Sequence, residues 1–490
     1  TKGMTIAKGG IYEVKGDTYT GSIIVTSSEP VTINITGNVT VTGGDPFVSA
    51  QGSGKLEINN DGFTVNCGKR HFLYTYTPAD VTVDGGIYKT GGGIFLIMAF
   101  SGQLTLKNVD AWAEQASALT SAANVHVMDS QFHHTGVSGN KYAAVNNSAT
   151  MTLNNVKIVS TEGAITNGNS ATMTVDGGLF IIKDGTFIAT GASCIDNNWG
   201  QVRINGGSFT TDAGIAVKNR GGLRLNGGTV EAPNGTAIDI SGESGDVQLN
   251  GGTIRNSVTG VRVADAGDSE IALKAVTFEN NTDDISLGED QQINIKKTFT
   301  GKAKILVDDA KAGRRITQEN DDTRYQKDLN LVSNNEGYTI GYKRGEDGKE
   351  YRYLADANGN AVSTQDAKAT ADLGAGAQQL DTTDVVPEGK DVTVTADIPA
   401  GAEFLEWSVV RADGEALDWT PAEDDPQTIT FTMPGCNVTV AALYQNNTPD
   451  PVNPGGGDDP VTEFFEAAAV TGVAAWGLYE TATGIYRVLN

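Results

Sequence analysis

The chain has 490 residues, with 35 Lys and Arg against 60 Asp and Glu, which gives a formal net charge of −25. Such a surface repels nucleic acid and anionic membranes, so neither is an expected partner. Gly at 61 residues and charged residues at only 19% indicate a turn-rich β protein rather than a helical one.

Residues 1–30 contain two short apolar runs separated by turn residues, and we expect them to form the first turn and N-terminal cap of a repeat structure. No apolar leader segment precedes them, which indicates a mature, processed protein.

Residues 31–310 carry a short repeated phrase. It is clearest as VRINGG at 202–207, LRLNGG at 223–228 and VQLNGG at 247–252, where the asparagines lie 21 and 24 residues apart. Each phrase alternates apolar and polar residues and ends in a turn, so the period indicates a β-solenoid. Weaker copies of the phrase occur on both sides of these three. The residues equivalent to the asparagine of the phrase, one per coil, are 34, 59, 84, 107, 128, 154, 176, 205, 226, 250, 274 and 296, which predicts about 12 coils.

A second column of asparagines supports the same register. Asn147, Asn167, Asn197 and Asn219 each follow a β-branched residue by two positions. Stacked coils would align these asparagines as a ladder of side-chain amides, each bonding to the next coil. The pattern resembles the right-handed parallel β-helix of the pectin-lyase-like superfamily, over roughly residues 20–310.

The catalytic sets of that superfamily are not found. Its pectate-lyase members carry clustered Asp residues with an Arg or Lys base, and its polygalacturonase members carry Asn-Thr-Asp, Asp-Asp and Gly-His-Gly motifs. Asp283-Asp284 has no such partner on neighbouring coils. We therefore expect a protein that is not an enzyme and uses no cofactor.

Two long intervals between coils, from Met128 to Asn154 and from Asp176 to Asn205, are the expected places for a ligand groove. A glycan groove would use the following candidates: His133, Tyr142, Asp196, Trp199 and Lys218. Asp196 lies one coil before Lys218 and Arg220. These residues form either a small polar site or an ordinary ion pair between coils. Trp199 is either a sugar-stacking residue or a structural aromatic.

Metal binding is not expected. His133 and His134 are adjacent on a strand, so their side chains should point to opposite faces and cannot chelate together. Asp265 and Asp268 resemble a calcium turn, but a solvated loop is the expected explanation.

The repeat phrase ends before residues 311–360, which predict a C-terminal cap and a hairpin. Residues 361–445 then alternate as a small all-β domain. The segments FLEWSV at 404–409, ITFTMP at 429–434 and NVTV at 437–440 resemble the bacterial-repeat module related to internalin B-type repeats. That module recurs in surface proteins of Gram-positive bacteria, so the resemblance implies an extracellular protein, either bound to the cell surface or secreted.

A Pro- and Gly-rich linker at residues 446–462 leads to an apolar tail at 463–490. Acidic residues interrupt the tail and no basic flank follows, so we expect no transmembrane span. The tail should instead dock on another surface through the aromatic anchors Phe464, Phe465, Trp476 and Tyr479.

Three functions remain open at this point. The first is a structural or adhesive surface protein that forms a homo-oligomer or filament through its tail. The second is a β-helix that binds, or less readily cleaves, a carbohydrate. In the third, the tail is the segment that precedes a cell-wall or S-layer anchor.

The three cysteines, Cys67, Cys194 and Cys436, are sparse and odd in number, so no disulfide framework is expected.

Overall fold

The computed structural model describes residues 2–490 except 136–141, 162–164, 168–178, 191–192, 213, 243–245, 266–269, 297, 319–328, 345–348, 358, 375, 382–383, 413–414, 447–477, 482–483 and 488–490. The chain divides into two compact units. The first comprises Thr1–Glu336 and Tyr342–Leu354, and the second comprises Gly337–Gly341 and Ala355–Asn490.

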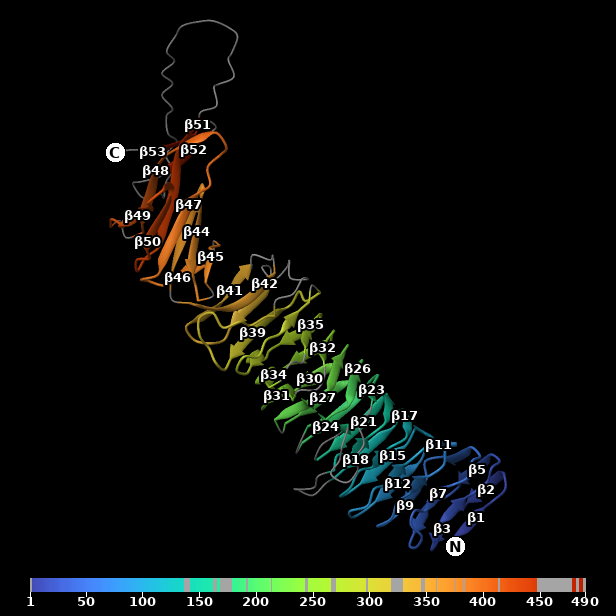
Figure 1. Ribbon diagram of the computed structural model, residues 1–490. Coiled ribbons are helices and arrows are strands. Elements are labelled where there is room, and N and C mark those ends of the chain that lie inside the picture. Colours follow the sequence, from blue (N-terminus) through green and yellow to red (C-terminus); the bar gives the residue numbers. More distant parts are fainter. Residues whose placement is uncertain are drawn as a thin grey trace, which may run out of the picture. The chain divides into compact units, whose positions relative to one another are not determined.

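The first unit is a parallel β-solenoid built from three sheets (Figure 1). Sheet A has 15 strands: β1 (Met4–Ile6), β4 (Ile23–Val25), β7 (Val48–Ala50), β10 (Leu73–Thr75), β13 (Ile97–Ala99), β16 (Leu119–Ser121), β19 (Val145–Asn147), β22 (Ile165–Asn167), β25 (Ile195–Asn197), β28 (Ile215–Asn219), β31 (Thr236–Ser241), β34 (Thr259–Asp265), β37 (Asp283–Leu287), β39 (Lys302–Val307) and β40 (Asn330–Ser333).

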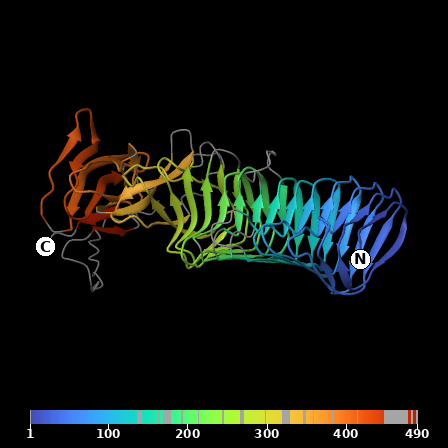
Figure 2. The same ribbon diagram turned by 90° about the horizontal axis from the view of Figure 1, so that it is seen from below.

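Sheet B has 13 strands: β2 (Gly10–Val14), β5 (Val31–Ile35), β8 (Leu56–Asn60), β11 (Asp80–Asp84), β14 (Gln103–Lys107), β17 (Asn124–Met128), β20 (Thr150–Asn154), β23 (Leu179–Ile182), β26 (Gln201–Ile204), β29 (Gly222–Leu225), β32 (Val247–Leu249), β35 (Ile271–Leu273) and β38 (Asn294–Ile295). Sheet C has 12 strands: β3 (Asp17–Tyr19), β6 (Val39–Val41), β9 (Thr64–Asn66), β12 (Ile87–Thr90), β15 (Asp110–Ala113), β18 (Gln131–His134), β21 (Val156–Ser160), β24 (Gly185–Ala189), β27 (Ser208–Thr211), β30 (Thr229–Glu231), β33 (Thr253–Arg255) and β36 (Thr277–Glu279). The first 12 coils, β1 to β36, each contribute one strand to each sheet, and beyond them β37, β39 and β40 extend sheet A while β38 extends sheet B. Figure 2 shows the strands of successive coils side by side along the solenoid. The predicted all-β fold of about 12 coils is confirmed.

The register of sheet B confirms the predicted ladder at every position but one. Asn34 aligns with Asn59, and the alignment continues coil by coil to Leu273 and Ile295, which precede residues 274 and 296. The exception is Asp176, which lies outside the described residues. Leu153 pairs with Ile182 and Ile182 with Ile204, so the next residue, Lys183, occupies the ladder position.

The error has a physical cause. The segment VDGG at residues 175–178 imitates a strand end followed by a glycine corner, whereas the real strand reads LFII and shows no alternation. The 29-residue interval therefore runs from Asn154 to Lys183, and the next interval, from Lys183 to Asn205, is an ordinary 22 residues. Consequently Trp199 follows β25 in a regular coil rather than in an insertion.

The predicted second asparagine column is also confirmed. Asn147, Asn167, Asn197 and Asn219 align in consecutive strands of sheet A. The Asn197 amide donates to Oδ1 of Asn219 over 2.6 Å, and both side chains are fully buried. Because a buried amide without a partner is costly, this ladder helps to hold the coils in one register.

Left-handed residues turn the chain from sheet B to sheet C. Asn108, Asp129 and Asn155 have φ near +50°, and in the repeated phrases the second glycine takes this role. At Gly228, where φ is +88°, an added Cβ would lie 2.6 Å from the carbonyl oxygen of Gly207 on the preceding coil. The phrase therefore ends in glycine because neighbouring corners approach too closely for a side chain.

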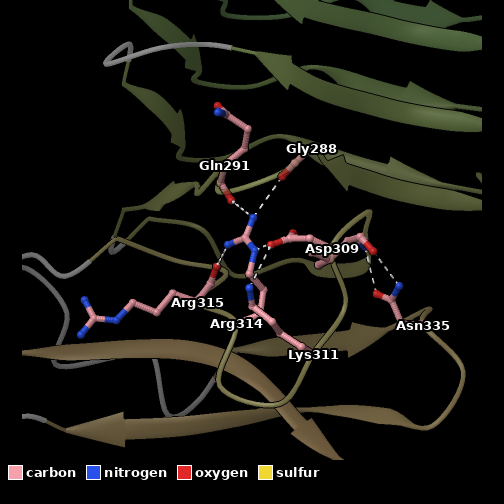
Figure 3. A network of polar contacts seen from close by, with 8 residues as sticks. Gly288, Gln291, Asp309, Lys311, Arg314, Arg315 and Asn335 are labelled. Carbon is pink, nitrogen blue, oxygen red and sulfur yellow. Dashed lines mark hydrogen bonds and ion pairs between the residues drawn. The ribbon is translucent and has the colours of Figure 1, made fainter. Parts of the chain in front are cut away.

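The C-terminal end of the solenoid is closed by a buried arginine (Figure 3). Nε of Arg314 lies 2.7 Å from Oδ1 of Asp309, and Nη2 donates to the carbonyl oxygens of Gly288 and Gln291 over 3.0 and 2.9 Å. Asn335 bonds both the N–H and the carbonyl oxygen of Val307 through its side chain. These contacts satisfy backbone groups that a further coil would otherwise have bonded. β41 (Tyr338–Arg344) and β42 (Glu350–Asp356) follow as a two-stranded sheet.

The second unit contains two small sheets. One has β46 (Val385–Val386), β43 (Asn360–Gln365), β51 (Val438–Asn446) and β48 (Ala402–Arg411), and the other has β45 (Ala377–Gln379), β44 (Ala367–Asp372), β47 (Asp391–Ala396), β50 (Asp425–Thr432) and β49 (Trp419–Ala422). Val394, Ile429, Phe431 and Val440 are buried, and Nε1 of Trp407 donates to the carbonyl oxygen of Pro426. A hairpin of β52 (Leu478–Thr481) and β53 (Gly484–Arg487) is the part of the predicted tail that is described.

Candidate functional site

The five residues predicted for a glycan groove lie on or next to strands of two different sheets. Asp196 and Lys218 lie on β25 and β28 of sheet A, and Trp199 follows β25. His133 lies on β18 of sheet C, and Tyr142 precedes β19 of sheet A. The structure therefore brings Asp196, Trp199 and Lys218 to one region and separates His133 from them.

Asp196 stands directly beside Lys218 in the register of sheet A. Its Oδ1 atom is buried without a hydrogen-bond partner. Burial raises the pKa of Asp196, and the positive charges of Lys218 and Arg220 act in the opposite direction. The alternation continues along the sheet, because Lys218 aligns with Asp239 and Asp239 forms an ion pair with Arg262 at 2.6 Å. Negative and positive side chains therefore alternate along the outer face of sheet A, in the order Asp196, Lys218, Asp239 and Arg262.

Trp199 projects beside this ladder with 61% of its surface exposed. The guanidinium of Arg220 donates to Oδ1 of the adjacent Asn198 over 3.0 Å. An exposed indole beside amide and guanidinium groups can contact both the apolar face and the hydroxyl groups of a sugar.

His133 belongs to a column on the outer face of sheet C. Its ring stacks on Trp112 with centroids 3.8 Å apart, and the ammonium of Lys89 lies 5.5 Å from the Trp112 ring centroid. Nε2 of His133 lies 3.3 Å from Oδ1 of Asp110. Burial lowers the pKa of His133, Asp110 opposes that shift, and Lys157 adds to it.

The adjacent His134 points into the solenoid, as the alternation of strand residues predicts. Its Nδ1 lies 2.9 Å from the hydroxyl of Ser160, and burial lowers its pKa. The two histidines therefore cannot hold one metal ion together. No group of three or more His, Cys, Asp or Glu side chains that could hold a metal was found in the described part of the chain. Asp268 and the side chain of Asp265 lie outside that part.

Sequence reasoning missed an aromatic cluster on sheet A. Tyr74 on β10 packs edge-on against Tyr76 and Phe100 at 5.6 and 5.5 Å between ring centroids. Tyr76 and Phe100 stack face to face at 4.8 Å with an interplanar angle of 5°. We call these three side chains the aromatic platform. Its signal was the sequence Tyr74-Thr75-Tyr76, which places two tyrosines on one strand face.

A polar relay supports the platform from one side. Nδ1 of His71 lies 2.6 Å from Oδ1 of Asp45, and its Nε2 lies 2.7 Å from the Tyr74 hydroxyl. A carboxylate only accepts hydrogen bonds, so Nδ1 of His71 donates to Asp45 and Nε2 faces the Tyr74 hydroxyl. Burial and the charge of Asp45 raise the pKa of Tyr74 above its ordinary value. Tyr74 therefore stays a neutral phenol, which suits a binding contact better than a catalytic base.

Tyr142, the remaining predicted groove residue, packs against Phe95 with ring centroids 5.1 Å apart. Phe95 lies two residues before β13, the strand that Phe100 follows. The predicted tail anchors Phe464, Phe465 and Trp476 lie outside the described residues, and Tyr479 lies in β52, opposite Tyr486.

Comparison with known proteins identifies one part of the chain. Residues 366–448 match the family described as the divergent InlB B-repeat domain. This confirms the predicted internalin B-type module near the C-terminus. Such domains are typical of bacterial surface proteins, and a β-solenoid joined to one is consistent with that class.

No curated protein and no solved structure matches the chain. The resemblance to the pectin-lyase-like superfamily therefore stays a prediction. Among the described residues, no helix has the length and apolar character needed to cross a membrane. Cys67, Cys194 and Cys436 are free thiols.

Proposed function

We propose that this chain is a non-enzymatic structural or adhesive protein on the cell surface of a Gram-positive bacterium. The observation that carries the proposal is the continuous solenoid followed in the same chain by a B-repeat domain. A solenoid whose coils each bond their neighbours gives length and a large side surface from a simple repeat. The B-repeat domain would link that surface to the rest of the assembly.

Localisation tests this proposal directly. Antibodies raised against the purified chain should label intact cells of the source bacterium, and lysis should add little signal. A cytoplasmic protein labelled alongside should become visible only after lysis. Labelling of the chain that appears only after lysis would contradict a surface role.

The proposal extends to self-assembly through the C-terminal tail. Its support is the apolar sequence beyond a Pro- and Gly-rich linker, with Phe464, Phe465, Trp476 and Tyr479 as anchors. If the tail docks on the next copy, negative-stain electron microscopy should show fibres of the full chain and single particles of a version cut after Asn447. Fibres from both versions would contradict a role for the tail. Native peptides beyond Asn490 would favour the wall-anchor alternative.

A second candidate function, carbohydrate binding, has its own support. Trp199 is 61% exposed in the turn that follows Asp196, whose Oδ1 is buried without a partner. A sugar could stack on the indole while its hydroxyl groups bond the amide of Asn198 and the guanidinium of Arg220. Screening the full chain on a glycan array tests this function, and silence across plant, host and bacterial glycans would remove it.

A further inference from the structure

The aromatic platform is exposed although its geometry is firmly held. Tyr76 is 49% exposed, and Tyr74 and Phe100 are partly exposed. The Asp45–His71–Tyr74 relay fixes the Tyr74 ring, and Tyr74 in turn packs edge-on against both other rings. Rings held before a ligand arrives lose little conformational entropy on binding, so such a surface favours recognition.

One face of the platform has no ring beside it in the next coil. Backbone bonds align Tyr76, Phe100, Ala122 and Ser148 in successive coils, through Phe100 to Thr75, Ala122 to Ala99 and Ser148 to Ser121. The 4.8 Å between the Tyr76 and Phe100 rings equals the usual strand spacing of about 4.8 Å, so the ring planes lie across the solenoid axis. The register therefore places the small side chain of Ala122 next to Phe100 in the following coil.

The chemistry around this face selects a kind of ligand. Flat aromatic faces match the C–H face of a pyranose ring, and the phenol of Tyr76 can bond a hydroxyl group, whereas the carboxylate of Asp45 is engaged by His71 and contributes only its charge. The carboxylate and the net charge of −25 disfavour polyanions such as polygalacturonate. An uncharged sugar chain satisfies both conditions.

We propose that the aromatic platform binds a pyranose unit of an uncharged glycan, stacked on Phe100 above Ala122. This inference rests on the carbohydrate-binding function and assigns it a site on β10 and β13, which lie five and four coils from the Trp199 coil along sheet A. The other occupants, a second copy of the chain or an unrelated protein, are outcomes of the test.

Isothermal titration calorimetry of the full chain with cellohexaose, xylohexaose and chitohexaose tests the site, with hexagalacturonate as the anionic comparison. We expect saturable binding of at least one neutral hexaose and none of hexagalacturonate. Tyr76→Ala and Phe100→Ala should each weaken binding about tenfold or more, as loss of a central aromatic anchor does. Ala122→Leu should weaken it similarly because the larger side chain covers the free face while leaving all three rings in place.

Trp112→Ala is the matched control. Trp112 is also a stacked aromatic, 37% exposed, but it lies on sheet C, so its removal should leave binding unchanged. Circular dichroism of each variant should retain the wild-type spectrum, because these side chains lie outside the solenoid interior.

The outcomes separate this site from the function itself. Binding that survives at all three platform positions but is lost in Trp199→Ala would overturn the site and keep carbohydrate binding. No binding of any hexaose, with silence on the glycan array, would remove both. Preference for hexagalacturonate would overturn the assignment of an uncharged ligand, and self-association that Phe100→Ala abolishes would replace the glycan by a second copy of the chain.

Discussion

An Arg314→Met substitution would show how much the closing network stabilises the end of the solenoid. The Arg314 side chain is only 4% exposed, and its guanidinium bonds the carboxylate of Asp309 and the carbonyl oxygens of Gly288 and Gln291. Met keeps most of the apolar stem but leaves that carboxylate and those carbonyls without their donor.

The magnitude follows from the burial of the pair. Removing one partner of a buried, hydrogen-bonded ion pair costs about 3–5 kcal/mol, because the remaining charge stays desolvated. At about 1.4 kcal/mol for each tenfold change, this corresponds to two to nearly four orders of magnitude in a local opening equilibrium. Solenoid coils contact only their neighbours, so we expect the loss in β37 and β39 rather than in β1–β10.

Hydrogen exchange followed by mass spectrometry measures this opening coil by coil. Arg315→Met is a matched control, because Arg315 is the adjacent arginine, is exposed, and lies over the Tyr351 ring at 4.2 Å. We expect protection of β37 and β39 to fall strongly in Arg314→Met and by less than about 1 kcal/mol in Arg315→Met. Equal, small effects of the two substitutions would refute the view that Arg314 closes the solenoid.

Three further predictions concern the interior. Asn219→Ala should lower the free energy of unfolding by about 1–3 kcal/mol in urea titrations, because the buried Asn197 amide loses one of its acceptors and the carbonyl oxygen of Gly221 loses its donor. Asn226→Ala in the exposed ladder should cost less. Burial lowers the pKa of His134 below the unfolded value of about 6.5, so the unfolded chain binds a proton at a higher pH than the folded chain does. The free energy of unfolding should therefore fall as the pH drops below about 6.5. His134→Gln should make that pH dependence less steep, whereas His126→Gln, at an exposed position, should leave it unchanged. Burial raises the pKa of Cys194 to about 12 and also raises that of Cys67, so a thiol reagent at pH 8 should modify Cys436 alone in the folded chain and all three cysteines in urea.

The stacking of the solenoid could be predicted because its rules are local. A coil needs inward apolar residues at alternate positions and a left-handed residue at its corner, and both leave a visible pattern in the sequence. The same pattern located the column of aligned asparagines from Asn147 to Asn219, since identical residues align only if the period is right. It failed at Asp176, where a corner-like VDGG preceded a strand whose four residues are all apolar.

The position of side chains around the solenoid depended on tertiary structure. His133, Asp196 and Trp199 all stood out as polar or aromatic residues near turns, but only the coil geometry shows that His133 lies on sheet C and the others on sheet A or just after it. The aromatic platform depends on contacts between Tyr74, Tyr76 and Phe100, which lie up to 26 residues apart, and on the relay from Asp45.

The sequence by itself thus determined the β-solenoid, its period, its asparagine ladder and the B-repeat domain, because each depends on short-range alternation and turn chemistry. Only the tertiary structure decided which side chains meet on an outer face. Outward residues are not constrained by the packing that produces the repeat, so their arrangement becomes visible only when one coil is placed in register upon the next.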